Sequence, residues 1–171
     1  ERFLYFSTAH IYGAPLAGDI TERTLPRPVH PYAITHHAAE EFVLAAHDQK
    51  RITCLVVRLS NGFGTPAHAN VDRWTLLVND LCRQAVQARQ LTLRSSGLQQ
   101  RDFITLHDVG RAVCHLLDLP RVACADGLFN LGGEYSMTVW VMTQRIAARC
   151  QATLGFTPPI YFAPAQECTA D

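Results

Sequence analysis

Two short apolar runs, residues 3–7 and 52–57, are separated by a segment with helical periodicity, and this alternation limits the fold more than any other feature. Continuously apolar strands are typical of parallel sheets that are covered on both faces. Parallel strands need a long crossover connection, which is usually a helix. The chain is therefore predicted to be an α/β protein with mostly parallel strand pairing.

The segment between these strands divides into a loop and a helix. Residues 13–31 contain four prolines and two glycines, a composition that favours a loop. A helix is predicted from Tyr32 to about Lys50, with Glu40 and Glu41 on its polar face. Its apolar face is predicted to hold Ala38, Ala39, Phe42, Val43, Ala45 and Ala46.

Shorter and more mixed elements follow the second strand. Asp108 is predicted to cap a helix that stops before Pro120, and Thr138 to cap a helix that reaches about Cys150. The change of pattern near residue 59 divides the chain into residues 1–60 and 61–171. A further helix is expected over residues 74–89, and strands over residues 91–94, 103–106, 128–131 and 160–162.

Charge and cysteine content exclude several classes of function. The 171 residues carry 15 basic and 15 acidic side chains, so no basic field favours nucleic acid or an anionic membrane. No apolar run is long enough to span a bilayer. The six cysteines include no C-x-x-C pair, which predicts buried, reduced thiols in a cytoplasmic protein.

The candidate site combines a tyrosine at the start of the predicted helix with a hydroxyl residue about two dozen positions upstream. Thr8 lies at the carboxyl end of the first strand, where open α/β sheets bind their ligands. A phenol and an alcohol can flank one substrate hydroxyl and move its proton. Tyr32 and Thr8 are therefore candidate catalytic residues.

Several stretches match one known family in order. The chain resembles the second half of an extended short-chain dehydrogenase/reductase, of the NAD-dependent nucleotide-sugar epimerase/dehydratase type, over residues 3 to about 150. The stretches are Ser7-Thr8-Ala9 with Tyr12-Gly13, Glu22, Pro31-Tyr32 with Glu40, the RLSNGFG of residues 58–64, Arg101-Asp102-Phe103-Ile104 with Asp108-Val109, and the FNLGG of residues 129–133.

The resemblance implies a fold, a cofactor and a substrate class. Residues 1–60 would form the second half of a Rossmann domain, and residues 61–171 a substrate-binding lobe with returning Rossmann elements. The cofactor would be NAD or NADP, and the substrate a nucleotide sugar. The resemblance also allows a homodimer, because the helix at Tyr32 commonly pairs across a dimer in that family.

The resemblance also implies roles for individual residues. Tyr32 would act as acid/base on a sugar hydroxyl during hydride transfer, and Thr8 would polarise the same oxygen. His36, in the position of the family's lysine, would be the third catalytic residue. Tyr32, His36 and Leu59 would line the cofactor. Asn61 and Arg101 would contact the phosphate region of the substrate, and His10 would face the sugar. Arg58 and the Gly132-Gly133 turn between a strand and a helix are interpreted as structural.

Three features depart from the family pattern. His36 stands where the family usually has lysine, and histidine, with an ordinary pKa of about 6.5, is mostly neutral at pH 7. This change is compatible either with a working variant or with lost redox chemistry. Ala9 and His10 replace the acidic pair of the dehydratases, which favours an epimerase or keto-sugar reductase. The glycine-rich dinucleotide fingerprint is absent and is expected upstream of Glu1; without it, the chain is expected to hold NAD weakly.

Three other functions compete with this interpretation. A zinc site lacks the H-E-x-x-H pattern, and solvated helix pairs explain its candidate ligands better; these are His36, His37, Glu40, Glu41 and His47. A serine hydrolase using Ser7 lacks the G-x-S-x-G elbow. The strongest alternative is a non-catalytic nucleotide-sugar-binding homologue, which the substitution by His36 motivates.

Overall fold

The computed structural model describes residues 1–16, 18–68 and 70–163. The chain divides into two compact units: one contains residues 1–62 and 102–135, and the other contains residues 63–101 and the part of the chain from residue 136 onwards. The two units interleave along the sequence, so each is built from two separate segments.

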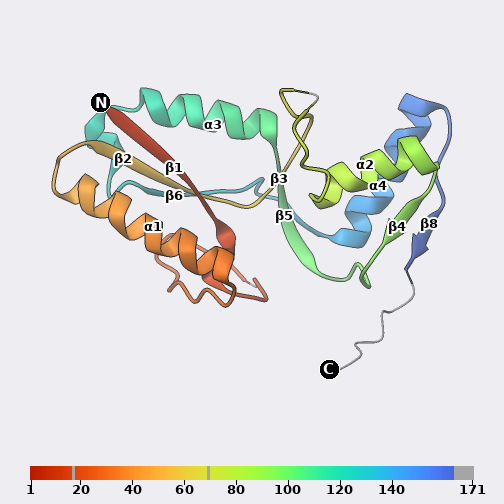
Figure 1. Cartoon of the computed structure of the whole chain (residues 1–171), viewed down its shortest axis with the longest axis horizontal. Coiled ribbons are helices and arrows are strands. Elements are labelled where there is room, and N and C mark those ends of the chain that lie inside the picture. Colours follow the sequence, from red (N-terminus) through yellow and green to blue (C-terminus); the bar gives the residue numbers. More distant parts are fainter. Residues whose placement is uncertain (17, 69, 164–171) are drawn as a thin grey trace. The chain divides into compact units, whose positions relative to one another are not determined.

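The first unit is a parallel sheet with a helix on each face. Its strands lie in the order β1-β2-β6, with β1 at Arg2–Thr8, β2 at Thr53–Leu59 and β6 at Leu128–Leu131. Both pairings are parallel. The helices α1 (Pro31–Asp48) and α3 (Leu106–Asp118) cover opposite faces of this sheet (Figure 1). The predicted α/β fold with parallel pairing is thus confirmed.

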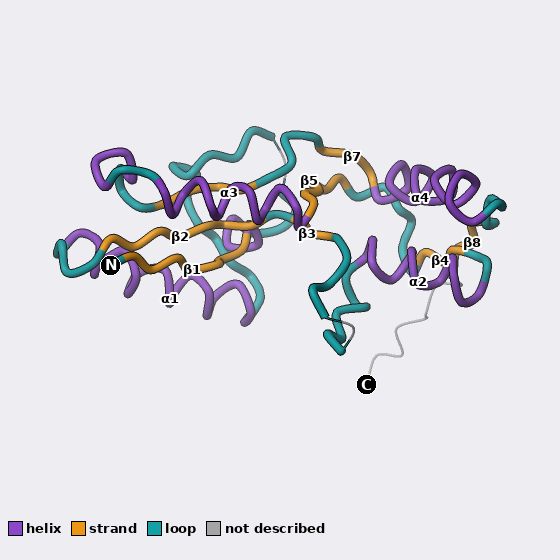
Figure 2. The backbone as a smooth tube through the Cα atoms, turned by 90° about the horizontal axis from the view of Figure 1, so that it is seen from above, coloured by secondary structure: helices purple, strands orange, loops and turns teal. Residues whose placement is uncertain are grey.

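The core of this unit lies mainly between β2 and α3. Leu55 and Val57 of β2 are fully buried and pack with Leu116 of α3 and with Cys124. Cys124 belongs to the short 3-10 helix η2 (Arg121–Cys124). Figure 2 shows β1 and β2 side by side. The opposite face of β2 faces α1. The last residue on that face is Arg58, a charged residue that is buried.

The second unit is built on two helices that pack against each other, α2 (Leu77–Ala88) and α4 (Val139–Leu154). The strands β4 (Leu91–Leu93) and β8 (Ile160–Phe162) pair in parallel beside them. Leu81, Leu91 and Leu93 are buried in this unit. The predicted cap Thr138 is confirmed, because its hydroxyl accepts from the Val141 N–H group at 3.1 Å.

Three short strands lie where the chain passes from one unit to the other. They are β3 (Asn61–Phe63), β5 (Gln100–Thr105) and β7 (Ser136–Thr138), hydrogen-bonded in the order β3-β5-β7. Neither β3 nor β7 was predicted from the sequence. Gly132 and Gly133 therefore connect two strands, β6 and β7, rather than a strand and a helix as predicted.

Two predicted helix details are wrong. Thr105, not Asp108, caps α3, because its hydroxyl accepts from the Asp108 N–H group at 3.1 Å. In α1 the predicted apolar and polar faces are misplaced: Phe42 is 81% exposed, and Glu40 is 0% exposed. The buried position of Glu40 depends on a partner on the sheet, which helical periodicity cannot show.

Candidate functional site

The carboxyl edge of the parallel sheet brings two of the predicted site residues together. Thr8 ends β1 and lies in register with Leu59, which ends β2 and pairs in turn with Leu131 of β6. Thr8 is buried, and its hydroxyl accepts from the His10 N–H group at 3.3 Å. Thr8 thereby caps the 3-10 helix η1 (Ala9–Tyr12), which packs against α1.

The predicted tyrosine stands in the first turn of α1. Pro31 opens this helix, and the His30 side chain caps it, because Nδ1 of His30 accepts from the Tyr32 N–H group at 3.2 Å. A proline is suited to this position because the first helical N–H group has no partner within the helix. The Tyr32 side chain is 51% exposed and so remains open to a ligand.

His36 lies one helical turn after Tyr32, and the two rings are in contact. Their centroids are 4.5 Å apart in an edge-to-face arrangement. On a helix, side chains four residues apart share a face. The sequence prediction that Tyr32 and His36 act in one place is consistent with this geometry.

Tyr5 joins this pair from β1, and sequence reasoning missed it. Its hydroxyl lies 2.8 Å from Nδ1 of His36. Burial raises the pKa of Tyr5, and the nearby Glu40 and Tyr32 raise it further. Tyr5 therefore stays a neutral phenol at physiological pH. A signal was available, since the hydroxyl of a tyrosine in a buried strand usually needs a hydrogen-bond partner.

A buried ion pair lies one turn further along α1. Nε of Arg58 donates to both carboxylate oxygens of Glu40, at 3.0 and 3.2 Å, and Nη2 donates to Oε2 at 2.7 Å. Arg58 is 4% exposed. Burial alone would lower the pKa of Arg58, but its hydrogen bonds to Glu40 and Tyr12 outweigh this, and the pKa is raised. The interpretation of Arg58 as structural agrees with this position.

The same arginine extends the network to the proline-rich loop. Nη1 of Arg58 donates to the Tyr12 hydroxyl at 2.8 Å, and this hydroxyl donates to Oδ1 of Asn130 at 2.7 Å. The Asn130 N–H group donates to Oε1 of Glu22 at 2.7 Å. Glu22 is one of the residues that carry the family resemblance, which assigned it no role. In the structure it holds the loop against the edge strand β6.

Asp102 is the centre of a further group of polar contacts, which holds Asn61. The carboxylate of Asp102 accepts from Ser60 Oγ at 2.6 Å and from the Gly133 N–H group at 2.7 Å. Nδ2 of Asn61 donates to the Asp102 carbonyl at 2.9 Å. Glycine is required at 133, because a Cβ atom there would overlap the Phe103 carbonyl oxygen. These contacts show a structural role for Asn61, while its predicted contact with a substrate stays a prediction.

The other two predicted substrate residues lie on different elements. His10 is exposed in η1, in the first unit. Arg101 is partly buried in β5, in the second unit. Their roles towards a substrate stay predictions.

The alternative chemistries find no support in the part of the chain that the structure describes. No group of three or more metal-ligating side chains is present among those residues. His37 pairs with Glu41 at 3.5 Å along the helix, as expected for a solvated pair. The Ser7 hydroxyl is buried without a hydrogen-bond partner among the described residues, so it has no base to activate it.

The described cysteines are all free thiols, as predicted, but not all are buried. Cys54, Cys124 and Cys150 are buried, whereas Cys82 and Cys114 are exposed. The prediction of buried thiols is therefore wrong for Cys82 and Cys114. Cys168 lies outside the described residues. Within the described residues no helix is long and apolar enough to cross a membrane.

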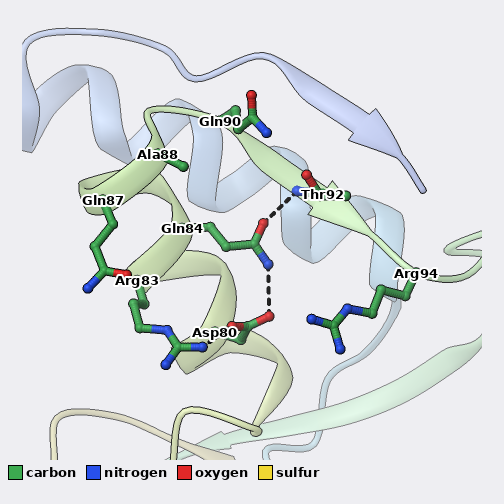
Figure 3. Close-up of a pocket in the computed structure, with 8 residues that line it drawn as sticks. All are labelled: Asp80, Arg83, Gln84, Gln87, Ala88, Gln90, Thr92 and Arg94. Carbon is green, nitrogen blue, oxygen red and sulfur yellow. Dashed lines mark hydrogen bonds and ion pairs between the residues drawn. The ribbon is translucent and has the colours of Figure 1, made fainter.

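A shallow pocket of about 290 Å³ lies between α2 and β4 (Figure 3). None of the predicted site residues lines it. Three of its side chains are hydrogen-bonded: Asp80 accepts from Arg83 at 2.9 Å and from Gln84 at 2.8 Å, and Gln84 accepts from the Thr92 backbone N–H group at 2.6 Å.

Residues 1–132 match the model of the NAD dependent epimerase/dehydratase family. The chain belongs to this family. The resemblance to extended short-chain dehydrogenases/reductases is thereby confirmed, and the family's dependence on NAD agrees with the predicted cofactor.

Curated relatives include both reaction types of the family. The chain is 28% identical over 141 residues to the human dTDP-D-glucose 4,6-dehydratase, covering 81% of this chain and 37% of that one. It is 29% identical over 127 residues to the dTDP-L-rhamnose 4-epimerase of Burkholderia thailandensis, covering 74% and 34%. The chain thus spans less than half the length of these relatives.

Solved structures confirm the Rossmann-like fold. The UDP-glucose 4-epimerase of Thermotoga maritima, solved with UDP-glucose, superposes with a TM-score of 0.76 at 19% identity, covering 98% of this chain and 52% of that one. The UDP-glucuronic acid 4-epimerase of Bacillus cereus, in complex with UDP-glucuronic acid and NAD, gives 0.74 at 22% identity, covering 96% and 49%. At such identities the likeness is one of fold.

Proposed function

We propose that the protein carrying this chain is an NAD(P)-dependent epimerase or keto-sugar reductase that acts on a nucleotide sugar. The observation that carries the proposal is the position of Tyr32. Its phenol is half-exposed in the first turn of α1, with the His36 ring against it. The helix α1 packs against β1 and η1, the elements that Thr8 joins at the carboxyl edge of the sheet.

The proposed chemistry needs one proton transfer at a sugar hydroxyl. Tyr32 would accept this proton as the hydroxyl is oxidised and return it on reduction, and the Thr8 hydroxyl would hydrogen-bond the same oxygen. General acid–base catalysis of this kind typically contributes about 10²–10⁴-fold to a rate. When bound, the nicotinamide cofactor accepts and returns the hydride.

The donors at this edge of the sheet fit a nicotinamide nucleotide. A ribose presents hydroxyl groups that both donate and accept hydrogen bonds. The Tyr32 phenol can do both as well, and the His36 ring nitrogen that does not contact Tyr5 can form one hydrogen bond to such a hydroxyl. Leu59 ends β2 at the same edge and is partly buried, so it offers an apolar contact. We propose that Tyr32, His36 and Leu59 form part of the cofactor site. We also propose that residues 1–60 are the dinucleotide-binding part of the chain and residues 61–171 its substrate lobe.

Two residues favour epimerisation or reduction over dehydration. Loss of water from a sugar needs an additional acid and base, and the positions after Thr8 hold Ala9, which cannot ionise, and His10. His10 is exposed in η1, where it could contact the sugar. Asn61 and Arg101 complete the proposed substrate contacts, near the phosphate groups; an arginine suits these because its planar fork pairs with phosphate oxygens.

A second candidate function is a nucleotide-sugar-binding homologue without redox chemistry. His36 favours it, because an imidazole gives less electrostatic support to a tyrosinate than a lysine ammonium does.

We also propose a cytoplasmic location, on the evidence of the free cysteines. We further propose a homodimer through the exposed face of α1 that carries Phe42.

The test is hydride transfer by the full-length protein with NAD or NADP and a panel of nucleotide sugars, from about pH 6 to 9. Turnover that falls by at least about 10²-fold in Tyr32→Phe supports the enzyme. Tyr161→Phe is the matched control, because it removes a half-exposed phenol in the second unit. Binding of a nucleotide sugar with no turnover anywhere in this pH range would instead establish the non-catalytic homologue.

A further inference from the structure

His36 makes contacts on two sides of its ring, and these contacts are of different kinds. Nδ1 lies 2.8 Å from the Tyr5 hydroxyl, which is a hydrogen bond. The Tyr32 ring makes an edge-to-face contact at 4.5 Å. No hydrogen bond joins Nε2 of His36 to any residue that the structure describes. One ring nitrogen is therefore taken by the protein, and the other is left for a ligand.

The direction of the hydrogen bond follows from the chemistry of its two groups. A neutral imidazole has one N–H group and one unprotonated nitrogen, and the unprotonated nitrogen is a strong acceptor. A phenol O–H is a better donor than a neutral imidazole N–H, because it is the stronger acid. The raised pKa of Tyr5, caused first by burial, keeps this hydroxyl protonated. Tyr5 therefore donates and Nδ1 accepts, which places the imidazole proton on Nε2.

We propose that Tyr5 is a positioning residue that fixes His36 as the neutral tautomer with its proton on Nε2. His36 then serves the site as a single directed N–H donor to a ligand hydroxyl, in place of a positive charge. This role rests on the proposed function insofar as the ligand is the nicotinamide nucleotide or the sugar. The tautomer itself depends only on the contact between Tyr5 and His36.

The hydrogen bond from Tyr5 gives a physical role to His36, which stands where the family usually has lysine. A lysine at this position would support Tyr32 through its charge and would need no partner to orient it. An imidazole has two different nitrogens, and only a second residue can decide which of them faces the ligand. Tyr5, on β1, is this second residue: its hydrogen bond to Nδ1 leaves Nε2 to face the ligand. The edge-to-face contact with Tyr32 holds the plane of the His36 ring.

The first test reads the tautomer directly. Nuclear magnetic resonance of the full-length protein, with ¹⁵N-labelled histidine at neutral pH, distinguishes a protonated ring nitrogen from an unprotonated one. We expect His36 in wild type to show an unprotonated Nδ1 and a protonated Nε2, and Tyr5→Phe to show a mixture of both tautomers. Tyr161→Phe should leave the His36 signals unchanged. A proton on Nδ1 in wild type, or the same signals in wild type and Tyr5→Phe, would overturn the inference.

The second test separates positioning from a general structural role. A glutamine amide nitrogen can replace Nε2–H and needs no tautomer, whereas an asparagine amide is too short to reach as far. We expect His36→Gln to keep at least about ten times more kcat/KM than His36→Asn. We also expect Tyr5→Phe to lower kcat/KM about tenfold in wild type but less than twofold in His36→Gln.

An equal loss from Tyr5→Phe in both backgrounds would contradict the positioning role, because Tyr5 would then act without His36. If wild type turns over no nucleotide sugar, the proposed enzyme function fails, and the tautomer measurement decides the inference by itself. The two failures are therefore distinguishable.

Discussion

The helix α1 carries two polar clusters one turn apart, and they differ in almost every physical respect. Glu40 is 0% exposed, and Arg58 satisfies it with three hydrogen bonds. Tyr32 is 51% exposed, and its neighbour His36 makes one hydrogen bond, to Tyr5. Spacing along the helix places Tyr32, His36 and Glu40 on one face, so sequence periodicity alone cannot separate them.

This difference separates the residues that stabilise the fold from those that can contact a ligand. A buried charge must be paired, so the Glu40–Arg58 cluster fixes α1 on the sheet and leaves no capacity for a ligand. A half-exposed phenol costs little to leave unpaired and can meet a substrate. The first cluster should therefore control stability, and the second should control activity.

The largest expected effect is on stability, from breaking the buried pair. Arg58→Met leaves the Glu40 carboxylate buried without a partner, and we expect it to lower the free energy of unfolding by about 3–5 kcal/mol. Chemical denaturation of the full-length protein measures this. Arg149→Met, at an exposed position on α4, is the matched control and should change the free energy by less than about 0.5 kcal/mol. Equal effects of the two variants would show that the pair does not hold the helix.

A smaller effect is expected when both charges are removed together. Glu40→Met combined with Arg58→Met leaves no unpaired charge, so most of the stability lost in Arg58→Met should return. The same denaturation measurement gives the coupling between the two sites. A loss in the double variant as large as the sum of the single losses would contradict the view that the unpaired charge, and not the missing contact, is what destabilises.

The smallest effect concerns Tyr5 and the alkaline side of the stability profile. Its pKa in the folded protein is raised above the ordinary value of 10.0, first by burial. The unfolded chain thus loses this proton at a lower pH than the folded protein does. The stability contribution is fully present below about pH 10 and is lost as the pH rises through the folded pKa.

Wild type should accordingly lose stability above pH 10 more steeply than Tyr5→Phe does. Denaturation at several pH values, together with the ultraviolet absorbance of tyrosinate, measures this difference. Parallel profiles for the two proteins would mean that the Tyr5 hydroxyl is not held in the second cluster as we describe.

The sequence predicted the framework of the fold because that framework depends on local patterns. The apolar runs at residues 3–7 and 52–57 identified β1 and β2, and the proline before Tyr32 identified the start of α1. Because β1 and β2 were expected to be parallel, their carboxyl ends placed Thr8 and Leu59 on one edge of the sheet.

The remaining features depend on contacts between residues far apart in the chain. Nothing near Glu40 in the sequence shows that Arg58 faces it, so a helix with a buried carboxylate was predicted to turn its alanines and Phe42 inwards. Likewise, β3 and β7 form strands by pairing with β5, which is far from β3 in the sequence and separated from β7 by a helix and β6. Tyr5 was missed for the same reason, since its partner lies 31 residues further along the chain.

Two tyrosines provide the most direct test of the division between the clusters, because the same substitution removes one hydroxyl from each. The Tyr12 hydroxyl accepts from Arg58 and donates to Asn130, whereas the Tyr32 phenol is half-exposed. The measurement is kcat/KM together with the free energy of unfolding for Tyr12→Phe and Tyr32→Phe in the full-length protein.

We predict that Tyr12→Phe lowers the free energy of unfolding by about 1–3 kcal/mol and keeps most of the turnover of the folded protein. Tyr32→Phe should keep its stability within about 0.5 kcal/mol and lose at least about 10²-fold in kcat/KM. A Tyr32→Phe variant that is as active as wild type, or a Tyr12→Phe variant that is equally stable but inactive, would contradict this account.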